Sequence, residues 1–155
     1  MNEPLGGTLI DRTCPSGQRD ALLAQAEALP SLTAGDSLIL DLEKIANGTF
    51  SPLVGFLGSA DTASVLDSMH LTSGHPWTIP IVFHTNPTSA AACSVGKTCA
   101  IRSERDGTVV ATMDVEEIYD FDRDSFISNV FRTSDPAHPG VGQVLNWGSK
   151  LVAGP

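Results

Sequence analysis

Apolar residues recur at the spacing of an α-helix in three stretches of the first half of the chain. The expected helices lie within residues 16–30, 31–48 and 58–71, with Ser16, Asp36 or Ser37, and Ser59 as their N-terminal caps. Pro30 follows the first helix, and Asn47-Gly48 is typical of a left-handed helix exit. The predicted apolar faces are Leu22, Ala26 and Leu29, then Leu38, Leu42 and Ile45, and finally Leu66 and Met69 with Thr62 or Ala63.

After residue 74 the pattern changes from helical spacing to short runs rich in β-branched residues. Residues 76–84 predict a strand at an edge or bulge, because Pro80 cannot donate to a sheet. Residues 98–121 predict a hairpin that turns at Asp106-Gly107. The remaining expectations are a strand at 7–11, a helix at 122–133, a rigid loop at 134–140 and a last strand at 150–154. The sum is an α+β fold, with a curved small sheet or barrel in the second half.

The composition restricts the class of partner. The chain of 155 residues has 9 Lys and Arg against 18 Asp and Glu, for a net charge of −9. This balance disfavours nucleic acids and anionic membranes as partners, because binding to either depends largely on cationic side chains. No apolar run approaches the roughly 18 residues of a membrane span, and the N-terminus lacks the pattern of a signal peptide. Three cysteines, an odd number, fit free thiols in a reducing cytoplasm.

No motif in the chain predicts catalysis, a cofactor or a metal. Gly96-Lys97-Thr98 resembles the end of a phosphate-binding loop, but Ala91 occupies the position of its first glycine. The residues that follow also predict a strand rather than a helix, which favours a turn that leads into a strand. The four histidines form no metal-binding spacing, and the acidic residues of 114–124 lack the spacing of a calcium loop.

The order of short motifs resembles the N-terminal portion of the ATP sulfurylase (sulfate adenylyltransferase) family. The resemblance covers nearly the whole chain. Its motifs are Leu32-Thr33, Asp41-Leu42-Glu43, Phe50-Ser51-Pro52-Leu53, Gly55-Phe56, Met69, Leu71, Gly74, Trp77 to Ile81, the hairpin from Ser94 to Arg123, and the Asp135-Pro136-Ala137-His138-Pro139 loop. The resemblance implies one PUA-like domain over residues 1–155, a β-barrel with helices packed at one side.

The resemblance also implies that the chain by itself is not catalytic. The family's nucleotide-site motifs, Gln-x-Arg-Asn-Pro-x-His and His-x-Gly-His, belong to a later nucleotidyltransferase domain and are absent from this sequence. His70 stands where an arginine is usual, and Thr62 stands where a tyrosine is common. Within the segment 47–57, Gly48 ends a helix and Pro52 fixes a turn. Phe50 and Phe56 are expected to anchor it as a structural brace.

Two functions remain open from the sequence. The chain is either an accessory domain that packs against a catalytic domain or another sulfate-assimilation protein, or a free-standing PUA-like module that binds a small ligand, a protein or RNA. Association with itself is a further option. The candidate docking residue is Trp147, because the segment 141–155 carries Lys150 as its single charged side chain. Trp147 could equally close the barrel, since tryptophans are buried on average.

Overall fold

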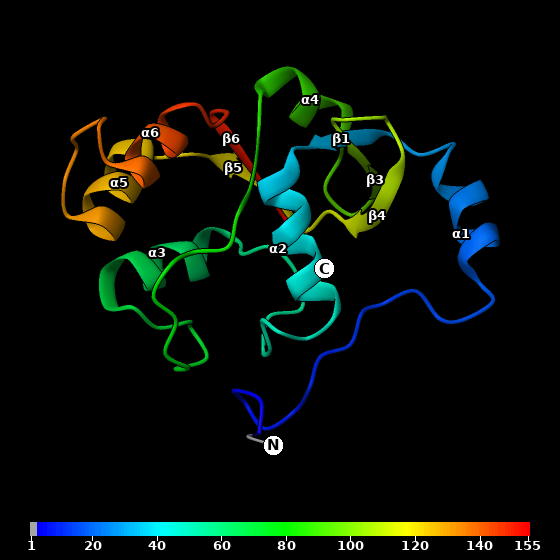
Figure 1. Cartoon of the computed structure of the whole chain (residues 1–155), viewed down its shortest axis with the longest axis horizontal. Helices are drawn as coiled ribbons and strands as arrows, with labels where there is room; N and C mark the ends of the chain where they lie inside the picture. Colours follow the sequence, from blue (N-terminus) through cyan, green and yellow to red (C-terminus); the bar gives the residue numbers. More distant parts are fainter. Residues whose placement is uncertain (1–2) are drawn as a thin grey trace.

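A computed structural model of the chain describes residues 3–155. Helices and strands are interleaved along the sequence (Figure 1). The helices are α1 (Arg19–Ala26), α2 (Asp36–Ala46), α3 (Ser59–Ser68), α4 (Pro87–Ala92), α5 (Arg123–Phe131) and α6 (Pro139–Leu145). The strands are β1 (Ser31–Ala34), β2 (Phe83–Thr85), β3 (Thr98–Ser103), β4 (Val109–Asp114), β5 (Glu117–Asp120) and β6 (Lys150–Ala153).

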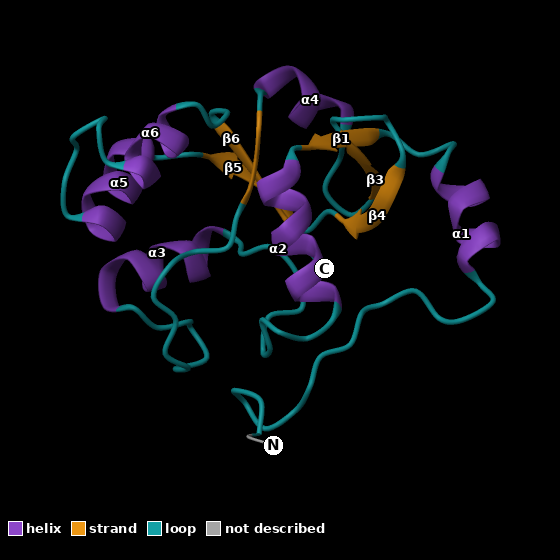
Figure 2. Cartoon of the chain, viewed as in Figure 1, coloured by secondary structure: helices purple, strands orange, loops and turns teal. Residues whose placement is uncertain are grey.

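The six strands form two small sheets, so the predicted α+β class is confirmed. One sheet has the order β1-β3-β4 and the other the order β2-β6-β5. The β1–β3 pair is parallel, whereas the other strand pairs are antiparallel. Figure 2 shows α3, α5 and α6 grouped beside the β2-β6-β5 sheet, while α1 lies at the opposite end of the molecule. Helix α2 stands between these two ends.

The chain crosses from one sheet to the other between β4 and β5, where it pairs with the C-terminal residues. The amide of Asp114 donates to the carbonyl of Pro155, and the amide of Glu116 donates to that of Ala153, both at 2.9 Å. Phe56 exchanges backbone hydrogen bonds with Gly154 in the same place (3.1 and 3.2 Å). Three segments that are distant in sequence therefore meet at Gly154.

Glycines make this close approach possible. Gly154 has φ 147°, a backbone conformation that other residues rarely adopt. A Cβ atom at Gly154 would overlap the carbonyl of Asp114, and one at Gly55 would overlap the carbonyl of Gly154. Neither neighbour is a flexible side chain that could move aside. Substitution at either glycine should therefore separate the segments that meet here.

The main hydrophobic core lies between α2 and the strands of both sheets. Its fully buried members include Leu32, Phe83, Ile101, Met113 and Val152. A second cluster joins β6 to α5 and α6, and a third packs α3 against the segment around Leu53. The second cluster holds the aromatic side chains that surround Trp147.

The N-terminal caps differ from those expected. Gly35 and Gly58 precede α2 and α3, and Gln18 precedes α1, with no side-chain cap hydrogen bond in any of the three. The predicted caps Ser16, Asp36 or Ser37, and Ser59 are therefore wrong. At the N-terminus of α3 a residue from β5 acts as the cap. The carboxylate of Glu117 accepts hydrogen bonds from the Ser59 amide (2.8 Å) and hydroxyl (2.6 Å). A partner 58 residues away leaves no local sequence signal.

Several further expectations need correction. The strand predicted over 76–84 begins only at Phe83, as β2, and the hairpin predicted over 98–121 ends with β4, because β5 pairs with β6 in the other sheet. Residues 7–11 form no strand, and Ile10 is instead tied down by a hydrogen bond from its amide to the Ser51 hydroxyl (2.9 Å). Residues 31–34 form β1, which was expected to belong to the helical stretch. Helix α6 begins within the predicted loop 134–140, and α4 was not foreseen. Met69 is half-exposed rather than internal, because α3 ends at Ser68.

The segment 47–57 acts as the predicted brace. Phe56 is buried, with 4% of its surface exposed, and meets Phe83 edge to face at a centroid distance of 5.3 Å. Phe50 is only half-buried and contacts Trp77 in the same manner at 5.7 Å. Gly48 has φ 78° directly after α2, as expected of a left-handed exit. The anchoring therefore depends mainly on Phe56.

We predict that Phe56→Ala lowers the free energy of unfolding by about 3–5 kcal/mol, the usual cost of truncating a buried phenylalanine. Phe50→Ala is the matched comparison and should cost less, because its ring is half-exposed. Urea denaturation followed by tryptophan fluorescence measures both values. A Phe56→Ala midpoint equal to that of the wild type would show that the brace does not stabilise the fold.

Candidate functional site

Trp147, the docking residue predicted from sequence, lies in an aromatic cluster at the end of α6. Its ring stacks on His84 from β2, with a centroid distance of 4.6 Å and an interplanar angle of 10°. Phe126 meets it edge to face at 5.4 Å, and Phe121 lies at 5.8 Å. The ring is half-buried, so one part packs internally and another part remains accessible. Both roles considered for Trp147 are compatible with this position.

Arg123 fixes the backbone beside this ring. Its guanidinium donates to the carbonyl of Trp147 at 2.6 Å and lies over the ring of Phe121, 5.8 Å from the centroid. The Arg123 Nε is buried, with no hydrogen-bond partner among the described residues. Helix α5 is thereby attached to the chain that leads into β6.

Burial in this cluster lowers the pKa of His84 to about 4, from an ordinary value of 6.5. The imidazole is therefore neutral at pH 7 and stacks on Trp147 as an aromatic ring rather than as a cation. Folding disfavours its protonated form, so the unfolded chain binds a proton at a higher pH than the native chain does.

The phosphate-loop resemblance at Gly96-Lys97-Thr98 leads to a strand, as predicted. Gly96 has φ 78° in a turn, and β3 begins at Thr98. The Gly96 amide donates to the carbonyl of Val115 at 2.8 Å, so this amide is already used within the fold and does not point to a ligand. The helix N-terminus that a phosphate-binding loop requires does not follow this turn.

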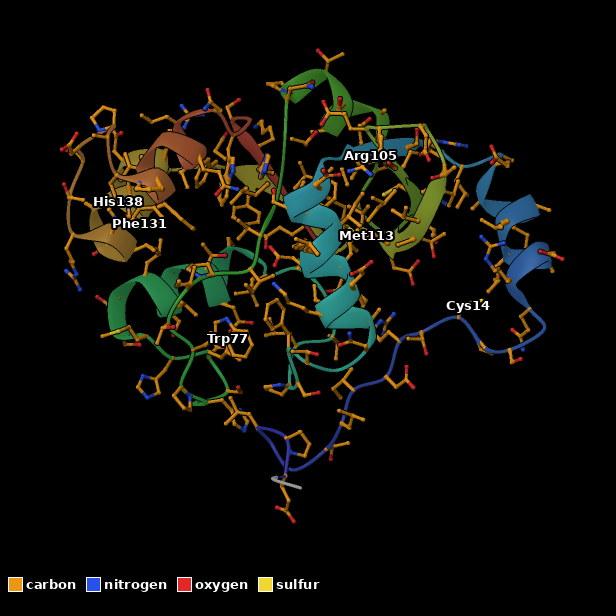
Figure 3. The ribbon with its side chains drawn as sticks, in the orientation of Figure 1. Cys14, Trp77, Arg105, Met113, Phe131 and His138 are labelled. Carbon is orange, nitrogen blue, oxygen red and sulfur yellow. The ribbon has the colours of Figure 1, made fainter. Side chains whose placement is uncertain are left out.

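Cys93 and Cys99 are neighbours in the main core, whereas His84 and His138 lie on β2 and at the start of α6. His138 caps α6 by accepting from the Val141 amide (3.4 Å), and its ring lies 5.1 Å from that of Phe131 (Figure 3). Across residues 3–155, no group of three or more His, Cys, Asp or Glu side chains could hold a metal ion. The three cysteines are free, and burial raises the pKa of Cys99 to about 12.

A second candidate site, not predicted from the sequence, is a cavity at the other end of the molecule, between α1 and β4. It has a volume of about 740 Å³, within the range of roughly 300–1,000 Å³ that ligand pockets occupy. Apolar side chains of α1, α2, β4 and the brace line it, together with Gly154 and Pro155. Figure 3 shows Met113 on the α2 side and Cys14 on the N-terminal segment across from it. We call this cavity the α1–β4 groove.

A smaller cavity of about 390 Å³ lies between α3, α5 and β5. The Tyr119 hydroxyl donates to the carbonyl of Leu57 (2.8 Å) and lies 2.9 Å from the Thr62 hydroxyl. Burial raises the pKa of Tyr119 to about 12, so the hydroxyl stays protonated. The Tyr119 hydroxyl in this cavity is thus engaged within the fold, whereas the α1–β4 groove borders the outer edge of β4, where no strand of the described chain pairs.

No helix among residues 3–155 is long and apolar enough to cross a membrane. The fold itself is a small α+β domain with an aromatic cluster at one end and an apolar groove at the other. The model of the PUA-like domain family matches residues 2–155. The chain belongs to the PUA-like domain family.

Curated relatives place this domain within longer proteins. The chain is 40% identical to the sulfate adenylyltransferase of Hyperthermus butylicus over 155 residues, which are 100% of this chain and 39% of the relative. It is 41% identical to that of Chloroflexus aurantiacus over 154 residues, 99% of this chain and 38% of the relative. The chain thus spans about 39% of the length of the relatives that it matches, and it corresponds to their N-terminal PUA-like domain.

A solved structure agrees with this placement. The hexameric APS kinase from Thiobacillus denitrificans superposes with a TM-score of 0.69 at 30% sequence identity. The match covers 79% of this chain and 24% of that one. In this case too, the shared domain is a minor part of a longer polypeptide.

We predict that stability falls between pH 6.5 and pH 4 in a manner that depends on His84. The pKa of His84 is depressed on folding, so its contribution is present above the unfolded value and is lost as pH falls through this window. After allowance for solvent screening the loss should be about 1–2 kcal/mol. Urea denaturation at several pH values should give a shallower pH dependence for His84→Gln than for the wild type.

The exposed His70→Gln serves as the control for this measurement, since it removes a histidine outside the aromatic cluster. It should retain the slope of the wild type. Equal slopes for His84→Gln and the wild type would contradict the burial of a neutral imidazole.

Proposed function

We propose that the chain acts as the non-catalytic PUA-like domain of a sulfate adenylyltransferase, and that it contributes to sulfate activation by packing against a catalytic domain. The observation that carries this proposal is the match between the entire chain and 39% of the length of a sulfate adenylyltransferase, at 40% identity. The remaining length of those enzymes provides room for the chemistry. A separate sulfate-assimilation protein or a second copy of the chain is a further partner within the same proposal.

The content of the chain supports a role without chemistry of its own. Neither of the two nucleotide-site motifs that the resemblance calls for occurs in the sequence. The side chains of the aromatic cluster are engaged with one another, and the groove is lined mainly by apolar groups. Activation of sulfate requires preorganised groups that stabilise charge on the reacting phosphate. We therefore assign those groups to the catalytic domain and assign docking to this chain.

The finer architecture belongs to the same proposal. We infer one PUA-like domain over residues 1–155, whose two sheets are the halves of a barrel joined by the pairing of 114–116 with 153–155. The accessible edge of Trp147 is the proposed docking point at the aromatic end. A reducing cytoplasmic location fits the three free cysteines.

A chimera tests this function. We predict that the matched segment of the Hyperthermus butylicus enzyme can be replaced by this chain with sulfate-dependent pyrophosphate release retained, within about tenfold of the parent. The isolated chain should release none above background. The parent enzyme lacking the segment is the control and should be inactive or unstable. A folded chimera without activity, or turnover by the isolated chain that a substitution within it abolishes, would refute the proposal.

A further inference from the structure

The outer edge of β4 carries backbone groups that no strand of the described chain uses. β4 is the last strand of the β1-β3-β4 sheet among residues 3–155. Backbone groups of alternate residues in an antiparallel strand point to opposite edges. Val115 exchanges hydrogen bonds on the β3 side, with Gly96 and Lys97, whereas Asp114 donates to Pro155 on the outer side. Thr112, two residues before Asp114, therefore directs its amide and carbonyl to the outer edge.

The C-terminal residues of the chain already pair with the extension of this edge. The bonds Asp114 to Pro155 and Glu116 to Ala153 have the spacing of an antiparallel ladder. Pro155 is the last residue of the sequence in this ladder, and Thr112 is the next position on β4 whose outward backbone groups have no partner among residues 3–155. An extended segment that continued the ladder would meet Thr112 two residues beyond the position that Pro155 occupies, without any movement of β4.

The α1–β4 groove provides the space for such a segment. Pro155 and β4 from Val109 to Met113 line one side, and α1 lines the opposite side with Leu22, Leu23 and Ala26. The floor consists of half-buried Ile39 and Leu42 and of buried Ile45 and Phe56. A strand bound here would direct alternate side chains onto this apolar floor, the arrangement found when peptides add to an exposed sheet edge.

We propose that the β4 edge and the α1–β4 groove bind, as an added antiparallel strand, the polypeptide that follows the PUA-like domain in sulfate adenylyltransferases. This inference rests on the proposed function. Continuity favours this occupant, because the ladder that it would extend already includes the last residues of the domain, and because the relatives contain more than twice the matched length. The bound segment should alternate apolar and polar residues, with the apolar ones facing Ile39 and Leu42.

Thr112→Pro tests the added strand directly. Proline removes the outward amide and is tolerated at a sheet edge when that amide points away from the neighbouring strand. Thr112→Ala is the matched control, since it also loses the side chain but keeps the amide. The ligand is a labelled peptide with the ten or so residues that follow the matched segment in the Hyperthermus butylicus enzyme, titrated into the full chain.

We expect saturable binding to the wild type, a dissociation constant within twofold for Thr112→Ala, and at least tenfold weaker binding for Thr112→Pro. Melting temperatures of the free variants establish that each is folded. If Thr112→Pro does not fold, amide hydrogen exchange of the wild-type chain, measured with and without the peptide, tests the added strand instead. The amide of Thr112 should exchange at least tenfold more slowly with the peptide bound, whereas that of exposed Val95 should not change.

Two results would overturn the proposal. One is no binding at millimolar peptide, or binding without protection of Thr112. The other is dimerisation of the chain alone that Thr112→Pro abolishes, which would make a second copy the occupant. Neither result bears on the chimera, whose activity tests the proposed function separately. An active chimera with no peptide binding would retain the function and reject the β4 edge as the contact.

Discussion

The backbone crossing at Gly154 is the constraint on which the rest of the structure depends. Phe56 and Gly154 exchange hydrogen bonds there, while the neighbouring residues 153 and 155 receive the amides of the β4–β5 connection. The two small sheets have no strand in common, and these backbone hydrogen bonds connect them. Only glycine fits at this position, since a Cβ would overlap the Asp114 carbonyl. The brace, both sheets and the end of the chain are thereby joined through a few backbone groups.

This crossing also determines which surfaces remain available for binding. It draws the C-terminal residues along the outer edge of β4 and into the α1–β4 groove. At the opposite end, the rings of the Trp147 cluster pack mainly against one another, which leaves less aromatic surface for a partner. The groove has an apolar floor and a strand edge with unused hydrogen-bonding groups, which together suit an extended polypeptide. A domain built in this way contributes to catalysis through what it holds in place.

The sequence predicted elements whose signal is local and missed those that depend on distant partners. Helix α2 and the β3–β4 hairpin follow directly from apolar spacing and from Asp106-Gly107. The hairpin predicted over residues 98–121 is too long, because β5 pairs with β6 in the other sheet. Strand β1 has four residues and pairs in parallel with β3, far along the chain, so its short pattern was absorbed into a helical stretch. The cap of α3 comes from Glu117, and the α1–β4 groove is built from segments that are far apart in the sequence, from Arg12 to Pro155. Neither the cap nor the groove produces a local sequence pattern from which it could be predicted.

The most direct test of the central claim, that the crossing at Gly154 holds the two sheets together, is the unfolding free energy of Gly154→Ala. Gly107→Ala is the control, because Gly107 also has positive φ (74°) but has open space around the position of a Cβ. The account predicts that Gly107→Ala loses about 1 kcal/mol, as expected of backbone strain alone. Gly154→Ala should lose several times more or fail to unfold cooperatively. Equal losses for the two variants would contradict the account.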